Sequence, residues 1–286
     1  MTTPCKIQLA RSAGFCFGVK RAIKMARELA QSGGDIRMLG DIVHNETVIR
    51  EMEHAGIRKI HRLGSGQGKT LLIRAHGASK STHAAARKRG YTIADATCPM
   101  VHEIHRIVER MDQDGRRIIV IGDPKHDEVL GIIGQIRRKA LVINGAGPIP
   151  EQAIRRIRRA AIVIQSTQNL NKIQPLIDKL LALIPDAKFF NTICKPTHLK
   201  QEEIKTMPEV NEVMIVIGSR TSANTQRLYE IAKAKNPRSY WIESADELKR
   251  AWFKGVRSVG VTAGASTPDE TTRAVIAAIR QDVSDL

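Results

Sequence analysis

Short apolar runs rich in valine and isoleucine alternate with amphipathic stretches along almost the whole chain. Runs of this kind are typical of parallel strands that are buried on both faces. The stretches between them carry apolar residues at helical spacing, so that Val19, Ile23 and Ala26, for example, fall on one stripe. The alternation predicts an α/β fold with mostly parallel sheets. The predicted strands lie within residues 5–10, 36–40, 70–77, 91–96, 116–122, 160–166, 212–219, 239–243 and 257–264.

Three of the four cysteines occupy equivalent places in this alternation. Cys16, Cys98 and Cys194 each stand near the end of a predicted strand and just before a predicted helix. Cys5 differs, because it lies inside the first predicted strand with no glycine or proline beside it. We interpret Cys5 as a small core residue, since a free cysteine packs as a buried hydrophobe.

A threefold repeat starts from these cysteines. A polar residue at another strand-to-helix junction follows each cysteine by 28 residues: His44, His126 and Ser222. A further junction recurs in each third of the chain: His76, Ser166 with Thr167, and Ser266. The regular spacing indicates internal repetition of one structural unit.

The repeat predicts three similar α/β domains around a pseudo-threefold axis with a central cleft. Functional groups gather at the carboxyl ends of parallel strands, so the junction residues should face that cleft. The predicted domains are residues 15–97, 98–193 and 194–286, and the N-terminal strand within residues 1–14 should complete the third.

Composition narrows the class of protein. The chain has 286 residues, of which 42 % are hydrophobic and 26 % charged, as in ordinary globular proteins. No window contains the run of about 20 apolar residues that a membrane-spanning helix needs, and the first residues lack the apolar stretch of a secretion signal. We therefore expect a cytoplasmic protein without a membrane partner.

The formal net charge is +17, and much of it lies in short arginine runs. These runs are Arg116-Arg117, Arg137-Arg138-Lys139, Arg155-Arg156 and Arg158-Arg159. Such runs are most often solvated helix faces or strand ends, although they can also contact nucleic acid. Aromatic residues make up only 3 % of the chain, which disfavours a stacking platform for single strands. We therefore do not expect nucleic-acid binding to be the main function.

The three junction cysteines suit a metal centre. A 4Fe-4S cluster held by three cysteines leaves one iron open to bind a substrate. Zinc with three cysteines is an alternative, although structural zinc sites usually use paired, closely spaced cysteines. Inert core cysteines are a further alternative, and the spacing alone leaves all three open.

Two of the strand-to-helix junctions resemble anion sites. Residues 218–224 and 262–270 are rich in Gly, Ser, Thr and Asn and lead into predicted helices, whose first N–H groups bind phosphate well. Plain helix capping is the more common use of such residues. In the second junction Pro268 suits the first helical turn, and Thr267 with Glu270 has capping-box spacing.

Glu128 is a candidate proton donor. It lies two residues after the junction histidine His126, where burial would raise the pKa of its carboxyl group. A plain role at a helix start, where a carboxylate favours the helix dipole, is the alternative.

Nine motifs occur in an order that resembles one known family. They are GFCFGVKRAI, VHNETV, RAHGAS, DATCPMVHEIH, HDEVLGIIGQ, QSTQN, ICKPTHLKQ, IGSRTSANTQRL and VGVTAGASTPD. Together they cover nearly the whole chain. The sequence is similar to the LytB-type hydroxymethylbutenyl diphosphate reductases, which catalyse the last step of the methylerythritol phosphate route to isoprenoids.

The resemblance implies a function for each junction residue. It implies a 4Fe-4S cluster on Cys16, Cys98 and Cys194, with one open iron for the substrate hydroxyl. Two electrons from ferredoxin or flavodoxin would remove this hydroxyl from (E)-4-hydroxy-3-methylbut-2-enyl diphosphate and give isopentenyl and dimethylallyl diphosphate. Glu128 would be the proton source, and Ser166 or Thr167 would orient the hydroxyl and the proton relay. The residues that would hold the diphosphate are His44, His76, His126, Ser222, Asn224 and Ser266.

Several positions depart from the family pattern. Ala223 replaces a hydroxyl residue between Ser222 and Asn224, and Asp127 replaces a proline, where its carboxylate could raise the pKa of Glu128. Ser166, Pro196 and Lys200 also differ from the residues usual in the family. These departures leave open a cluster-containing paralogue that reduces a related substrate, and the arginine runs leave open a basic nucleic-acid-binding protein.

Overall fold

The computed structural model describes residues 5–145, 147 and 149–284. Residues 1–4 and 285–286, which belong to the predicted third domain, lie outside the described residues. Two compact units make up the chain. The first comprises Met1–Lys20, His44–Val48 and Lys195–Leu286, and the second comprises Arg21–Val43 and Ile49–Cys194.

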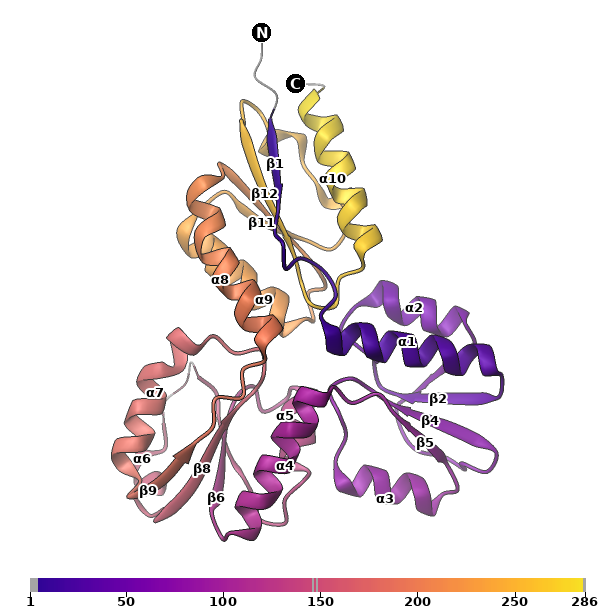
Figure 1. The fold of residues 1–286 in the computed structure, drawn as a ribbon, viewed down its shortest axis with the longest axis vertical. Helices are drawn as coiled ribbons and strands as arrows, with labels where there is room; N and C mark the ends of the chain where they lie inside the picture. The colour runs from indigo at the N-terminus through magenta and orange to yellow at the C-terminus, as the bar shows by residue number, and fades with distance from the viewer. Residues whose placement is uncertain (1–4, 146, 148, 285–286) are drawn as a thin grey trace. The chain divides into compact units, whose positions relative to one another are not determined.

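The described strands form three four-stranded sheets in which every pairing is parallel (Figure 1). One sheet has the order β3 (Arg58–Ile60), β2 (Asp35–Leu39), β4 (Lys69–Ile73), β5 (Thr92–Asp95). Another has the order β7 (Leu141–Ile143), β6 (Arg117–Ile121), β8 (Arg159–Ile164), β9 (Asp186–Phe189). The third has the order β11 (Ser239–Ile242), β10 (Val213–Ile217), β12 (Ser258–Ala263), β1 (Lys6–Leu9). The predicted α/β class with parallel sheets is confirmed.

The three sheets share one connectivity, as the sequence repeat requires. In the first two sheets the second strand along the chain lies at one edge, and the first and third lie in the centre; β10, β11 and β12 repeat this order in the third sheet. The position at the other edge is filled by β5, by β9 and, in the third sheet, by the N-terminal strand β1. The predicted boundaries at residues 15, 98 and 194, the axis and the cleft remain predictions.

Helices connect the strands and cover both faces of each sheet (Figure 1). Their bounds are α1 Phe17–Ser32, α2 Glu46–His54, α3 Lys80–Lys88, α4 Pro99–Gln113, α5 Asp127–Ile133, α6 Glu151–Arg155, α7 Leu170–Leu183, α8 Lys195–Val210, α9 Ala223–Lys235 and α10 Asp269–Ser284. Two short 3-10 turns, Ala245–Glu247 and Arg250–Trp252, follow β11.

Alternate residues of the central strands face opposite sides of a sheet, and both sides are apolar. In β6, Ile119 and Ile121 pack with Ile173 and Ile177 of α7. Ile118 and Val120 of the same strand pack in a separate cluster that includes residues of α4 and α5. Because both faces are covered, these strands read as continuous apolar runs rather than as an alternation.

All nine predicted strands are present, and three strands were missed: β3, β7 and β9. Each has three or four residues and lies at a sheet edge, with sequences RKI, LVI and DAKF. A strand of three or four residues is too short to show a clear apolar run or alternation in the sequence. The capping-box interpretation of Thr267 was wrong, because α10 begins at Asp269 and no hydrogen bond joins Thr267 to Glu270 among the described residues; the hydroxyl of Thr267 donates to the carbonyl oxygen of Ile217 at 3.1 Å.

Gly218 ends β10 at a point where no other residue fits. Its φ is +149°, and a Cβ there would lie 2.6 Å from Thr225 Oγ1 and 2.8 Å from Thr267 Oγ1. The missing side chain lets the first turn of α9 approach the end of β12 closely. The start of α9 is thereby held beside the junction that contains Ser266.

Lys200 is a buried cation that ties the loop before Cys16 to β12. Its side chain is 2 % exposed, and Nζ donates to the carbonyl oxygens of Gly14 at 2.9 Å and Ala263 at 3.2 Å and also to that of Ser12. A buried carbonyl that loses its donor costs free energy.

We therefore expect Lys200→Met to lower the free energy of unfolding by about 2–4 kcal/mol. Urea unfolding followed by circular dichroism measures this loss. Lys205→Met removes a more exposed lysine of the same helix and should change stability by less than about 0.5 kcal/mol. Equal losses in the two variants would contradict the tying role of Lys200.

Candidate functional site

Glu128 and Ser166 form a buried pair in the second unit. Glu128 lies in the first turn of α5, directly after the loop that follows β6, and Ser166 follows the carboxyl end of the adjacent strand β8. Glu128 is 2 % exposed, its Oε1 accepts from the backbone N–H of Ser166 at 2.6 Å, and its Oε2 accepts from Ser166 Oγ at 2.7 Å. The neighbouring ends of two parallel strands thus hold one carboxyl group in a fixed position.

Burial raises the pKa of Glu128, and the two hydrogen bonds from Ser166 oppose this shift without cancelling it. The carboxyl group therefore keeps a proton at a higher pH than an exposed glutamate does. Such a group can deliver a proton to a bound molecule.

This shift predicts a pH-dependent stability. The folded chain holds the proton of Glu128 more tightly than the unfolded chain does. The stability that this proton contributes to the folded chain is therefore complete below the ordinary pKa of 4.5 and is lost as the pH rises through the raised pKa. We expect Glu128→Gln to gain stability relative to the unsubstituted chain over that rise in pH. Urea unfolding at a series of pH values tests this, with the exposed Glu270→Gln as the control, and a difference that is the same at every pH would contradict it.

The expectation that the carboxylate of Asp127 raises the pKa of Glu128 was wrong. Asp127 does not contribute to the raised pKa of Glu128, which burial causes. Its Oδ2 instead accepts from Arg74 Nη1 at 2.6 Å. Arg74, which follows β4, was missed as a site residue, although it begins the motif RAHGAS. The positive charge of Arg74 offsets the negative charge of Asp127, so this carboxylate has less effect on its sequence neighbour Glu128.

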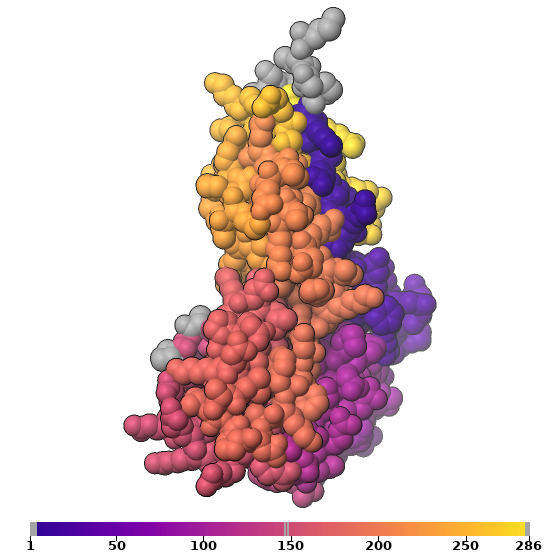
Figure 2. All heavy atoms as spheres, turned by 60° about the vertical axis from the view of Figure 1, so that its left-hand side comes forward, coloured from indigo at the N-terminus to yellow at the C-terminus, as the bar shows by residue number. Residues whose placement is uncertain are grey.

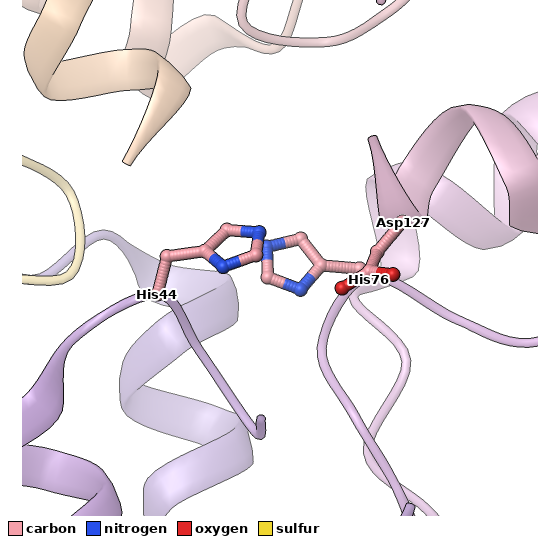
Figure 3. Close-up of side chains that lie close together, drawn as sticks. All are labelled: His44, His76 and Asp127. Carbon is pink, nitrogen blue, oxygen red and sulfur yellow. The ribbon is translucent and has the colours of Figure 1, made fainter. Parts of the chain in front are cut away.

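Two candidate histidines lie beside this pair in the second unit. The rings of His76 and His126 pack edge to face, with centroids 5.6 Å apart. His76 and Asp127 offer nitrogen and oxygen atoms within 4.8 Å of one another (Figure 3). His126 is the N-cap of α5, where its Nδ1 accepts from the backbone N–H of Glu128 at 3.1 Å. His76, His126 and the Glu128–Ser166 pair thus belong to one group of loops.

Thr167 also lies in this group, after β8. Its Oγ1 accepts from Gln165 Nε2 at 3.2 Å, and Gln165 Oε1 accepts from the backbone N–H of Asp123 at 2.9 Å. Gln165 therefore joins the loop after β8 to the loop after β6. Thr167 is half-buried and makes no hydrogen bond to Glu128 among those between described residues.

The first unit brings together four other candidates. Ser222 is the N-cap of α9, with its Oγ accepting from the backbone N–H of Thr225 at 3.3 Å, so the capping interpretation is correct for it. Ser266 Oγ donates to the backbone oxygen of His44 at 2.9 Å. Asn224 is 4 % exposed, and neither polar atom of its amide has a hydrogen-bond partner within the described chain.

A buried amide without a partner costs free energy, so it indicates a polar ligand. Asn224 lies in the first turn of α9, where helix N–H groups and the positive end of the dipole favour an anion. The first unit thus carries a candidate anion-binding group of residues, and the second unit carries the candidate acid. Convergence of both groups in one cleft remains a prediction.

The four cysteines form no disulfide among the described residues, and none is fully buried. Backbone hydrogen bonds fix the loops of the three junction cysteines: the N–H of Cys16 bonds to Ala265, that of Cys98 to Ala75 and that of Cys194 to Ser166. Each bond joins the cysteine to the loop after a central strand of its own sheet. Cys5 immediately precedes β1 and packs against the core of the third sheet, and burial raises the pKa of its thiol.

Comparison with known proteins identifies the family. The family model described as LytB protein matches residues 7–280. The chain belongs to the LytB family. A LytB relative from Aquifex aeolicus, named 4-hydroxy-3-methylbut-2-enyl diphosphate reductase, is 39 % identical over 270 residues, which are 92 % of this chain and 92 % of the relative. A relative of the same name from Geobacter sulfurreducens is 40 % identical and covers 96 % of this chain and 97 % of the relative.

Two solved structures are similar to this LytB chain. One, titled as (E)-4-hydroxy-3-methyl-but-2-enyl diphosphate reductase, the terminal enzyme of the non-mevalonate pathway, is 38 % identical with a TM-score of 0.72, covering 97 % of this chain and 99 % of the other. The E-1-hydroxy-2-methyl-but-2-enyl-4-diphosphate reductase from Plasmodium falciparum is 25 % identical with a TM-score of 0.86, covering 96 % and 87 %. Among its described residues, this chain has no helix with the length and apolar character needed to cross a membrane.

Proposed function

We propose that this LytB chain is an oxidoreductase that converts (E)-4-hydroxy-3-methylbut-2-enyl diphosphate to isopentenyl and dimethylallyl diphosphate. The buried Glu128 carboxyl, held by two hydrogen bonds from Ser166 beside His76 and His126, is the structural observation that carries this proposal. In the reaction the C–O bond of the substrate hydroxyl breaks. Two electrons and two protons enter, and one water molecule leaves with the product.

The diphosphate needs hydrogen-bond donors and positive charge. In our proposal His44, His76 and His126 contribute imidazole groups, and Ser222, Asn224 and Ser266 contribute hydroxyl and amide groups. The buried amide of Asn224 supports this assignment, because a phosphate oxygen would satisfy its N–H. The start of α9 adds backbone N–H groups and the positive end of its dipole.

Glu128 is the proposed source of a proton. Its raised pKa favours the protonated carboxyl group, which can deliver the proton to a bound molecule. Ser166 fixes the direction of the carboxyl group, and in our proposal it passes a proton on or, with Thr167, orients the substrate hydroxyl. Loss of the proton leaves a carboxylate that Ser166 stabilises through the same two hydrogen bonds.

The cysteines fit an iron–sulfur cluster as donors. All three junction cysteines lie outside any disulfide among the described residues and follow strand ends, and thiolates are the ligands that such clusters use. We assign Cys16, Cys98 and Cys194 as ligands of a 4Fe-4S cluster, which when bound would pass on the two electrons of the external donor and would offer an open iron that polarises the substrate hydroxyl. A ferredoxin or flavodoxin is the proposed electron donor.

An anaerobic assay tests the proposal. The purified chain, reduced by dithionite through methyl viologen, should consume the substrate and release both products, as measured by mass spectrometry. Asn224→Ala should raise KM about tenfold, because the loss of one hydrogen bond to a charged group costs about 1.5–3 kcal/mol of binding. Asn171→Ala is the matched control, since Asn171 holds the same position in the first turn of α7 and is exposed.

Two outcomes would contradict the proposal. Absence of product from a chain that carries iron would instead support a paralogue with a related substrate. An unchanged KM in Asn224→Ala would remove Asn224 from the diphosphate site.

A further inference from the structure

Three arginine runs that are far apart in the sequence meet at one surface of the second unit. Arg117 begins β6, Arg138 lies in the turn before β7, and Arg158 directly precedes β8. Since β7, β6 and β8 are neighbouring parallel strands, their amino ends lie at the same edge of the sheet. Side chains from the pink part of the chain project from the surface at the lower left of Figure 2.

The runs line a hollow of about 570 Å³, within the size range of small-molecule sites. We call it the basic hollow, and its lining residues are Gly115, Arg117, Arg138, Leu141, Ala153, Arg156, Ile157, Arg158 and Arg159. Five of these residues are arginines, and no carboxylate is among them. Half-buried Leu141 and Ile157 form an apolar part of the wall.

Some of the arginines near the hollow serve the fold. Arg116 is 4 % exposed and makes two hydrogen bonds to the carboxylate of Asp186, at 2.7 and 3.0 Å. Arg159 bonds to Asp186 and to Asp114, and Arg138 bonds to backbone oxygens of the turn before β6 and lies 3.5 Å from Asp112. These cations have carboxylate neighbours that offset their charge.

The remaining arginines of the hollow have no such neighbours. Arg117, Arg156 and Arg158 form no ion pair with any carboxylate among the described residues, and Arg156 and Arg158 are exposed. Three like charges around one hollow repel one another. An anion that carries several charges removes this repulsion and accepts the bidentate hydrogen bonds that guanidinium groups donate.

The hollow is separate from the candidate functional site. The hollow lies at the amino ends of β6, β7 and β8, whereas Glu128 and Ser166 follow the carboxyl ends of β6 and β8. Five to six residues of strand separate the two edges, which corresponds to about 15–20 Å. A ligand of the hollow therefore does not touch the residues proposed for catalysis.

We propose that the basic hollow binds a compact anion with two or more phosphate groups, such as free polyphosphate or a nucleotide. Its small size and the clustering of its arginines fit a compact anion better than an extended duplex, whose phosphates are spread along a helix. The hollow contains no aromatic side chain on which a single-stranded base could stack. The nucleoside of a nucleotide could pack against the apolar part of the wall.

Calorimetric titration of the purified full chain with inorganic tripolyphosphate in 0.15 M salt (about physiological) tests this proposal. We expect Arg156→Ala with Arg158→Ala to weaken binding at least about tenfold, because each arginine removes charge-assisted hydrogen bonds. Reductase turnover should stay unchanged in this variant, which separates the hollow from the active site. The matched control is Arg62→Ala, an exposed arginine elsewhere in the second unit.

Each outcome decides the proposal. Unchanged affinity in the double variant, or an equal loss in Arg62→Ala, would overturn it, because binding would then be elsewhere or diffuse. A DNA duplex that binds more tightly than tripolyphosphate and is lost in the double variant would also overturn it and assign the surface to nucleic acid. Adenosine triphosphate distinguishes the two sources of the ligand: tighter binding than tripolyphosphate indicates a nucleotide, and equal binding indicates free polyphosphate.

Discussion

Cys98→Ser should lose most of its bound iron and more than about 100-fold in reductase turnover. Mutation of groups that merely support a metal ligand already costs about 10- to 100-fold in metal affinity or activity, so loss of a ligand itself costs more. A serine hydroxyl does not replace a thiolate in an iron–sulfur cluster, because iron–sulfur sites select soft sulfur ligands. Cys16→Ser and Cys194→Ser should behave in the same way, since each cysteine occupies the same place in its own sheet.

Iron and sulfide counts per chain, the visible spectrum and turnover under anaerobic conditions measure the effect. Cys5→Ser is the matched control, because Cys5 packs against the core of the third sheet and has no proposed part in ligation. It should keep its iron and its turnover. Full iron content and turnover in Cys98→Ser would remove that residue from the ligand set.

Glu128→Gln should lower turnover by about 10²- to 10⁴-fold while the iron content stays the same. Glutamine has nearly the same shape, and its amide oxygen can still accept the 2.6 Å hydrogen bond from the backbone of Ser166. The amide cannot deliver a proton as a carboxyl group does. The variant therefore removes the acid and leaves its surroundings in place, so the loss should fall on kcat rather than on KM.

Asp127→Asn is the matched control for this experiment. Asp127 is the adjacent carboxylate, but it pairs with Arg74 and is not buried. We expect its replacement to change turnover much less than Glu128→Gln does. Comparable losses in both variants would show that charge near the site matters and that Glu128 has no special role in proton delivery.

The sequence predicted the fold well because its two main signals are local. Apolar runs mark strands that are buried on both faces, and the 28-residue spacing marks the same junction in each repeat. The missed strands β3, β7 and β9 have only three or four residues each, which is too short for the first signal to stand out. Strand pairing supplied the missing information, and it depends on residues that are distant in the sequence.

The candidate site was predicted less completely, because its electrostatics depend on partners from other loops. The motifs indicated Glu128 as an acid, and its pair with Ser166 agrees with that hypothesis. The partner of Asp127 could not be derived, since Arg74 lies 53 positions earlier and follows a different sheet. The basic hollow could not be derived from the arginine runs either. Each run has the pattern of an ordinary charged strand end, and only the order of the strands in the sheet brings the runs to one hollow.

The place of β1 in the third sheet has a consequence for synthesis of the chain. Lys6 of β1 pairs with Ser258 of β12, so the first strand to be synthesised can pair only after β12 has been synthesised. The strands of the other two sheets are contiguous in sequence and can pair as they leave the ribosome. In the third sheet, β1 has no partner strand until β12 has been synthesised. Contacts between such distant residues form slowly. An emerging chain therefore carries an unpaired β1, and with it the loop of Cys16, through most of its translation.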